Sequence, residues 1–158
     1  MTPEPTQAVE RLVVSWQDLD RLVEVLARQI GPGHDVILAI ARGGLVPAGM
    51  LAYRLGIRDI LVAAAARYDD TGEATDQPDF LEFPRPDELR GRRVLIVDEV
   101  WDSGITAHAV MERVRDADGQ PTIAVLHYKP GRSRVAARPD HAAAETEAWV
   151  VYPFKAGR

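Results

Sequence analysis

Residues 94–110 constrain the fold more than any other stretch of this sequence. They have the sequence VLIVDEVWDSGITAHAV, in which an apolar run ends on two acids and small residues then lead into a helical pattern. A short apolar run of this kind is typical of a strand buried on both faces, as in a parallel sheet. Two acids at its end are costly to desolvate unless they bind hydroxyls, a cation or hydrogen-bond donors. The stretch therefore predicts a strand, a ligand-binding loop and a helix.

Strands and helices alternate along the rest of the chain. Apolar residues at helical spacing predict helices over 16–30, 45–55 and 106–117, and Ser15 is a good N-cap for the first. Apolar runs predict strands over 35–40, 60–66, 93–97, 121–128 and 148–152. This order predicts an α/β fold with a doubly wound, mostly parallel sheet, in a single domain spanning 1–158. We expect residues 1–12 to be flexible.

Residues 67–88 do not follow this pattern. The segment is acidic, contains three prolines and has only a short apolar island at Phe80-Leu81. A loop of about twenty residues is uncommon inside a compact domain and is often a lid or a binding loop. We therefore predict a mobile loop over 67–88; the alternative is a solvated excursion with a short hairpin.

Composition excludes several classes of function. The 158 residues are 46% hydrophobic and 27% charged, which suits one globular domain. The absence of cysteine excludes disulfides, thiolate metal sites and cysteine nucleophiles. A net charge of -5 argues against broad nucleic-acid binding. No run of eighteen apolar residues and no secretory pattern at the start are present, so we expect no membrane association and a cytoplasmic location.

Three unusual stretches fall at the carboxyl ends of predicted strands, where ligands gather in such sheets. They are ARGG at 41–44, DEVWDSGIT at 98–106 and HYKPG at 127–131. In the second, hydroxyls and backbone N–H groups near a helix N-terminus suit a phosphate, and the two acids suit a diol about one sugar width away. A lone acid or hydroxyl would be explained by helix capping. The combination instead predicts a site for a ribose 5-phosphate.

The stretch VLIVDEVWDSGIT resembles the phosphoribosyl pyrophosphate binding motif of type I phosphoribosyltransferases. The resemblance covers roughly 13–154 and is closest to the 6-oxopurine transferases of the xanthine-guanine and hypoxanthine type. In that family, a turn like the one in IARGGLVPAGMLAYRLGI binds pyrophosphate, and a Lys-Pro pair like Lys129-Pro130 contacts the purine. An aromatic residue near the C-terminus, matched here by Trp149, stacks on the base. The resemblance also implies a small hood beside the sheet and a flexible loop.

The resemblance assigns the sugar-phosphate end of the site. Asp98 and Glu99 would hold the ribose hydroxyls, directly or through Mg²⁺ that also binds the pyrophosphate. Asp102 would face N7 of the purine and handle its proton. The 5-phosphate would be bound by Ser103, Gly104, Ile105 and Thr106.

The resemblance also assigns the pyrophosphate and base ends. Arg42 and Gly43 would contact the pyrophosphate, and Arg67-Tyr68 would begin the mobile catalytic loop. The base pocket would be formed by Lys129, Trp149 and the backbone of Val150. Each assignment has an alternative: Arg42 as a surface residue of a structural turn, Lys129 as a strand-end residue, and Trp149 as a core aromatic, with Tyr152 or Phe154 stacking instead.

Three residues depart from the family pattern. Glu99 replaces the usual second Asp, Arg67 replaces a Ser, and Trp101 stands where a smaller aliphatic residue is common. They suggest a divergent member whose preferred base need not be the expected one.

The function implied is Mg²⁺-dependent transfer of a phosphoribosyl group from phosphoribosyl pyrophosphate to a 6-oxopurine, in purine salvage, by a homodimer or homotetramer. Two alternatives remain open. One is a non-catalytic sensor of phosphoribosyl pyrophosphate or of a nucleotide, and the other is a transferase for a different base.

Overall fold

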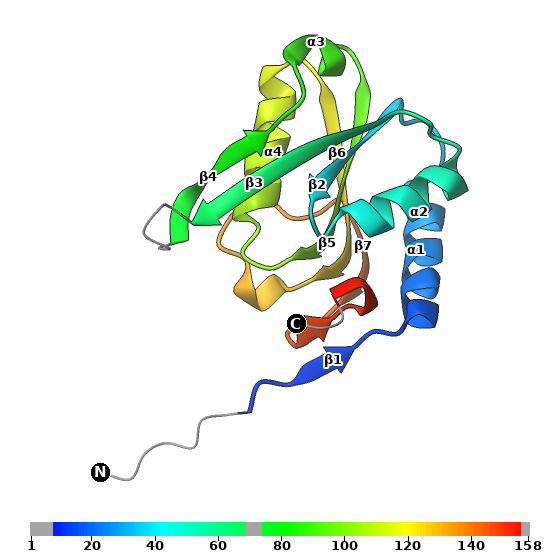
Figure 1. The fold of residues 1–158 in the computed structure, drawn as a ribbon, viewed down its shortest axis with the longest axis vertical. Coiled ribbons are helices and arrows are strands. Elements are labelled where there is room, and N and C mark those ends of the chain that lie inside the picture. The colour runs from blue at the N-terminus through cyan, green and yellow to red at the C-terminus, as the bar shows by residue number, and fades with distance from the viewer. Residues whose placement is uncertain (1–7, 69–73, 156–158) are drawn as a thin grey trace.

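The fold is centred on a six-stranded sheet with strand order β4-β3-β2-β5-β6-β7 (Figure 1). The structure is a computed structural model that describes residues 8–68 and 74–155, without the side chains of 67, 68 and 74–76. The strands are β2 (Val36–Ala41), β3 (Ile60–Tyr68), β4 (Ala74–Glu82), β5 (Arg93–Trp101), β6 (Gln120–Tyr128) and β7 (His141–Glu145). All neighbours pair in parallel except β3 and β4, which are antiparallel. The predicted doubly wound, mostly parallel sheet is confirmed.

Helices cover both faces of this sheet (Figure 1). They are α1 (Trp16–Ile30), α2 (Leu45–Leu55), the single turn α3 (Pro86–Leu89) and α4 (Ile105–Asp116), with short 3-10 turns η1 (Pro130–Arg132) and η2 (Pro153–Lys155). Ser15 caps α1 as predicted, because its side chain accepts the Asp18 N–H at 3.0 Å while Asp18 accepts the Ser15 N–H at 3.0 Å. The three long helices match the sequence predictions to within one residue.

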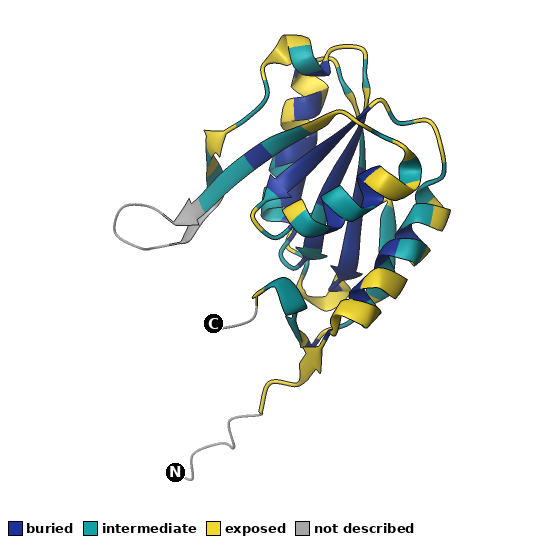
Figure 2. Ribbon diagram, turned by 45° about the vertical axis from the view of Figure 1, so that its right-hand side comes forward, coloured by how far each residue is buried: buried dark blue, intermediate teal, exposed yellow. Residues whose placement is uncertain are grey.

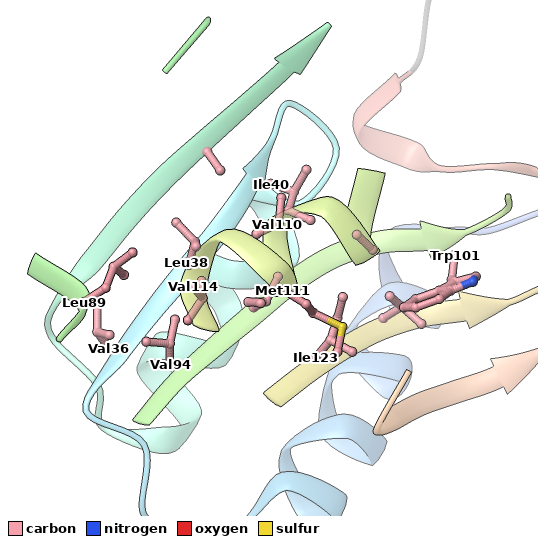
Figure 3. Close-up of a cluster of buried hydrophobic side chains, with 14 of the residues drawn as sticks. Val36, Leu38, Ile40, Leu89, Val94, Trp101, Val110, Met111, Val114 and Ile123 are labelled. Carbon is pink, nitrogen blue, oxygen red and sulfur yellow. The ribbon is translucent and has the colours of Figure 1, made fainter. Parts of the chain in front are cut away.

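The central strands are buried on both faces, as Figure 2 shows. Alternate residues of β2 and β5 pack to opposite sides, so Leu38 and Ile96 join α4 while Ile37 and Leu95 join α1 and α2. Figure 3 shows the side packed against α4. Each fully buried Leu or Ile contributes about 1.5–3 kcal/mol.

The segment 67–88 contains more regular structure than the sequence indicated. Residues 74–82 form β4, an edge strand paired antiparallel with β3, and 86–89 form α3. The prediction of a loop throughout 67–88 is therefore wrong, and the alternative that included a hairpin is closer to the structure. Phe80 and Phe83 pack edge to face at 5.0 Å beneath the Arg113 guanidinium of α4, which holds this strand against the domain. Residues 69–73 lie outside the described residues, and mobility of the segment stays a prediction.

A separate two-stranded parallel sheet lies below the main sheet in Figure 1. It pairs β1 (Arg11–Val13) with β8 (Trp149–Val151) and corresponds to the expected hood. The segment 1–12, expected to be flexible, overlaps β1 at its end, while 1–7 lie outside the described residues. Within the part of the chain that the structure describes, no helix has the length and apolar character needed to span a membrane.

Candidate functional site

The paired acids lie inside β5, near its carboxyl end, whereas the sequence placed them after a strand ending at 97. The strand continues to Trp101 because β6 pairs with it throughout, with Asp98 opposite Val125 and Trp101 opposite Tyr128. The chain then turns through Asp102 and enters α4 at Ile105. Acids and small residues therefore share one edge of the sheet.

The two acids have opposite protonation tendencies. Burial raises the pKa of Asp98 well above its usual range, and the adjacent Glu99 carboxylate adds to the effect. Burial also opposes ionisation of Glu99, but hydrogen bonds from Asp98 and Lys155 outweigh it and lower the pKa of Glu99. Lys155 Nζ lies 2.9 Å from Glu99 Oε1. Within this pair, Glu99 therefore ionises readily, whereas Asp98 tends to stay protonated.

The loop after β5 ends at the N-terminus of α4. Gly104, the N-cap residue, has a φ of 80° and provides no side chain to cap the helix. The Ser103 hydroxyl lies 3.4 Å from the Ile105 N–H. Backbone N–H groups at the start of a helix, next to hydroxyls, form a binding site for an anion such as a phosphate.

Trp101 fixes the shape of this loop. Its side chain belongs to the buried cluster of Figure 3 and is only 1% exposed. Its Nε1 donates to Ser133 Oγ at 3.1 Å, and its ring meets Tyr128 edge to face. A Cβ added to Gly104 would lie 2.2 Å from the indole nitrogen. The residue that departs from the family pattern is therefore a packing residue, and the loop fits over it because position 104 is glycine.

The turn after β2 approaches the acid pair closely. A Cβ on Gly43 would lie 2.0 Å from Glu99 Oε2, and one on Gly44 would lie 2.4 Å from the Val97 carbonyl oxygen. Both positions need glycine for this close approach. Arg42 precedes them with an exposed side chain and lines the same cavity as the two acids.

These elements border a cavity of about 370 Å³, which we call the main cavity because most of the predicted site residues line it. Its lining comes from β2 and its turn, the end of β3, and the β5–α4 loop: Ile40, Ala41, Arg42, Gly43, Ala65, Ala66, Asp98, Glu99, Val100, Trp101, Asp102, Ser103, Gly104, Thr106 and Ala107. Most of the residues predicted for the sugar, phosphate and pyrophosphate are thus brought together. Arg67 and Tyr68 follow the lining residues Ala65 and Ala66 directly in β3, and their side chains lie outside the described part of the structure.

The residues predicted for the base meet this cavity at Asp102. Lys129 is 4% exposed, and its Nζ lies 3.7 Å from Asp102 Oδ2 and 5.7 Å from the centre of the Trp149 ring. Trp149 is 56% exposed, so it is not a core aromatic. Val150, next to it in β8, is half-buried. Tyr152, one alternative for stacking, is fully buried.

Two cations at the site were not predicted. Arg132 Nε donates to Asp102 Oδ1 at 2.5 Å, and Lys155 contacts Glu99. The only local signal for Arg132 is its position in the turn after Lys129-Pro130, and Lys155 carries no motif of its own. Their partners are 30 and 56 residues away in sequence, so only the fold reveals the pairs.

The acids fit a magnesium ion shared with a substrate. Among the described residues no group of three or more His, Cys, Asp or Glu is placed to hold a metal by itself. Magnesium needs only one or two carboxylates when phosphate oxygens and waters complete its shell. Asp98 and Glu99 provide that number, and a dication beside them would offset the burial and the repulsion from Glu99 that disfavour ionisation of Asp98.

A phosphate loop, a buried acid pair and an Arg-Gly-Gly turn on one sheet edge are what the phosphoribosyltransferase resemblance implies. The chain belongs to the phosphoribosyl transferase domain family, whose sequence profile matches residues 7–151. It is thus a type I phosphoribosyltransferase, a pentosyltransferase close to the 6-oxopurine enzymes, as the sequence predicted.

Individual relatives agree with this. The chain is 32% identical over 160 aligned positions to the xanthine-guanine phosphoribosyltransferase of Gluconobacter oxydans, covering 98% of this chain and 90% of the relative. The enzyme of that name from Idiomarina loihiensis is 34% identical over 106 residues, which are 66% of this chain and 65% of the relative.

Solved structures resemble the whole fold. The purine phosphoribosyltransferase from Pyrococcus horikoshii has a TM-score of 0.76 at 31% identity, covering 92% of this chain and 93% of its own. A protein from Neisseria gonorrhoeae solved with bound ppGpp has a TM-score of 0.81 at 29% identity, covering 95% of this chain and 92% of its own.

Proposed function

We propose that this protein transfers the 5-phosphoribosyl group of phosphoribosyl pyrophosphate to a 6-oxopurine, giving the nucleotide and pyrophosphate, as a purine salvage enzyme. The observation that carries the proposal is the meeting of the two halves of the site at Asp102. This acid belongs to the phosphate loop, lines the main cavity and lies 3.7 Å from Lys129 on the base side.

The reaction breaks the bond from the anomeric carbon to pyrophosphate and forms one to a purine ring nitrogen. The carbon is oxocarbenium-like between these events, so water must be excluded and the leaving charge stabilised. The amides and hydroxyls from Ser103 to Thr106 anchor the 5-phosphate, and Asp98 and Glu99 orient the ribose hydroxyls. Arg42 and the Gly43 backbone stabilise the leaving pyrophosphate. Magnesium, held by the two acids, supplies additional positive charge to the pyrophosphate when it is bound.

The base side orients the nucleophile. The buried Lys129 ammonium donates to the exocyclic oxygen of the purine, Trp149 stacks on the ring and the Val150 backbone contacts its edge. Asp102 accepts the proton that the purine loses as its nitrogen bonds to the sugar. Lys129 therefore favours 6-oxopurines, because an exocyclic amino group in place of the oxygen cannot accept a hydrogen bond from the lysine.

The segment beginning at Arg67-Tyr68 covers the reacting carbon in this mechanism. Support comes from Ala65 and Ala66, which line the main cavity immediately before it. Closure of such a segment would exclude water during transfer. A homodimer or homotetramer and a cytoplasmic location complete the proposal; light scattering of the purified protein tests the first and fractionation of cells the second.

A sensor of nucleotides is the second candidate. It is favoured by the Neisseria neighbour, which was solved with bound ppGpp. A sensor would use the phosphate loop and the base-side lysine as well, but it needs no carboxylate placed to take a proton from the base.

One assay separates the two functions. The protein is incubated with phosphoribosyl pyrophosphate, Mg²⁺ and each of hypoxanthine, guanine, xanthine and adenine, and both nucleotide and pyrophosphate are quantified. We expect product with at least one 6-oxopurine and far less with adenine. Tight nucleotide binding without product from any base would refute the enzyme and favour the sensor.

A further inference from the structure

The second acid of the phosphoribosyl pyrophosphate motif is paired with a cation from the end of the chain. Lys155 Nζ lies 2.9 Å from Glu99 Oε1, and the Glu99 side chain is 12% exposed while that of Lys155 is 46% exposed. Lys155 lies beyond residues 7–151, the part matched by the family profile. The family profile therefore assigns no role to this contact.

A packed turn places Lys155 there. Tyr152 is 1% exposed, its hydroxyl donates to the Glu99 carbonyl oxygen at 2.9 Å, and it lies 2.8 Å from His127 Nδ1. Phe154 stacks on the Tyr152 ring at 5.2 Å with an interplanar angle of 10°. The backbone that carries Lys155 is thus fixed to the same strand residue, Glu99, that its ammonium contacts.

Lys155 also borders a second hollow that continues from the main cavity. This hollow has a volume of about 480 Å³ and is lined by Arg42, Gly43, Leu45, Val46, Glu99, Phe154 and Lys155. It shares Arg42, Gly43 and Glu99 with the main cavity. Two cations and one acid give it a net positive charge, which suits a polyanionic group reaching out from the sugar site.

We propose that Lys155 is a built-in cation for the pyrophosphate group, which occupies the second hollow between Lys155 and Arg42. Without ligand the ammonium neutralises Glu99. When pyrophosphate binds, the half-exposed lysine turns to the phosphate oxygens, and Glu99 becomes available to the ribose hydroxyls and the metal. The chain thereby supplies part of the positive charge that a metal ion otherwise provides. This proposal rests on the proposed function.

The direct test is calorimetric titration of the full-length protein with inorganic pyrophosphate, once with a chelator and once with Mg²⁺. Lys155→Met removes the charge and keeps the length of the side chain, and Lys155→Arg restores the charge. Arg90→Met removes one positive charge from an exposed residue next to α3, on the far side of the domain in Figure 1, and serves as the matched control.

We expect Lys155→Met to weaken pyrophosphate binding about tenfold in the presence of chelator, because one charge-assisted hydrogen bond is lost. With Mg²⁺ present the loss of affinity should be smaller. Lys155→Arg should stay within about threefold of wild type, and Arg90→Met within about twofold. The far-UV circular dichroism spectrum of Lys155→Met should match that of wild type, which shows that the variant is folded.

Equal pyrophosphate affinity of wild type and Lys155→Met in chelator would overturn the proposal. Tighter binding by Lys155→Met would overturn it as well, because Lys155 would then only compete for Glu99. Failure of the proposed function has a different signature, since the wild type would then form no nucleotide from phosphoribosyl pyrophosphate and any base, whatever its affinity for pyrophosphate.

Discussion

Asp102 stands between two cations of different exposure. Arg132, on the exposed η1 turn, donates to one carboxylate oxygen at 2.5 Å, and the buried Lys129 lies 3.7 Å from the other. These contacts aim the carboxylate at the junction between the sugar and base ends of the cavity. The position is the one required of a group that exchanges a proton with the purine.

Replacing Asp102 by Asn keeps the shape of the side chain and removes its basicity. We expect kcat to fall by about 10²–10⁴-fold. The free energy of unfolding should change much less, by about 1 kcal/mol, because the ion pair with Arg132 is largely solvent-exposed and screened and Lys129, at 3.7 Å, lies beyond hydrogen-bond distance. Initial rates and thermal unfolding check the two quantities. An unchanged kcat would remove the proton role from Asp102.

Gly104 faces two separate constraints, a left-handed backbone and the Trp101 ring. Gly91 shares the first, with a φ of 72°, but a Cβ there would meet nothing within 4 Å. We expect Gly91→Ala to cost about 1 kcal/mol of stability, the backbone contribution alone. Gly104→Ala should cost about 1–3 kcal/mol more, because the ring and loop must move apart.

Denaturant unfolding measures the stability of both glycine variants. Binding of phosphate should weaken in Gly104→Ala and stay unchanged in Gly91→Ala. Equal losses of stability in the two variants would mean that Trp101 does not support the loop.

At the scale of the elements, His127 of β6 anchors the C-terminal turn. Burial, with a smaller effect of Lys129, lowers the pKa of His127 to about 4 from 6.5. Neutral His127 hydrogen-bonds to Tyr152, which in turn donates to the backbone of Glu99. Below pH 6.5 the unfolded chain gains a proton at this position that the folded chain does not bind. The free energy of unfolding therefore falls as the pH drops from about 6.5 to about 4.

His127→Asn removes this titration and keeps a donor for Tyr152. The variant should lose less stability than wild type between pH 6.5 and 4. In that range the slopes of the unfolding free energy against pH should differ by nearly the value for one bound proton, and above pH 7 the two curves should be parallel. Urea unfolding at a series of pH values measures this. Parallel curves across the whole range would show that His127 is not buried as a neutral group.

Elements with strong periodicity could be predicted from sequence. The helices at 16–30 and 45–55 have clear apolar stripes and end at glycine, so their bounds were found. Strand β4 was missed because ATDQPDFLE is polar, contains Pro78 and lies at the sheet edge, where no alternation is required. Strand β7 was missed because three of its five residues are alanine, which gives no hydrophobic pattern.

The site was predictable where one local motif carries it. The acids and the phosphate loop lie within nine residues, and their spacing indicated a sugar phosphate before any fold was known. Arg132 and Lys155 could not be found in this way, since each pairs with an acid brought close only by the sheet. The role of Trp101 likewise depends on Gly104 and Ser133, which meet its ring in three dimensions.

At the scale of the whole molecule, the charge of the site opposes that of the protein. The chain carries a net charge of -5, yet four basic side chains of the described residues border the two cavities or contact Asp102 and Glu99. They are Arg42, Lys129, Arg132 and Lys155. This local positive field attracts a polyanionic substrate to an otherwise acidic surface.

Salt should therefore weaken substrate capture selectively. Raising the ionic strength from about 0.05 to 0.5 M should increase KM for phosphoribosyl pyrophosphate several-fold, because the Debye length shortens from about 14 to 4 Å. KM for the uncharged purine should change by less than about twofold. Steady-state kinetics at fixed Mg²⁺ provide both values. Equal salt dependence for the two substrates would contradict a site that works through local positive charge.

A crystal structure with a purine nucleoside 5′-monophosphate would show whether β5, its loop and the base-side residues form one nucleotide site. We expect the phosphate at residues 103–106, the ribose hydroxyls at Asp98 and Glu99, and the purine between Lys129 and Trp149. A nucleotide bound elsewhere, or with its base at the phosphate loop, would contradict it.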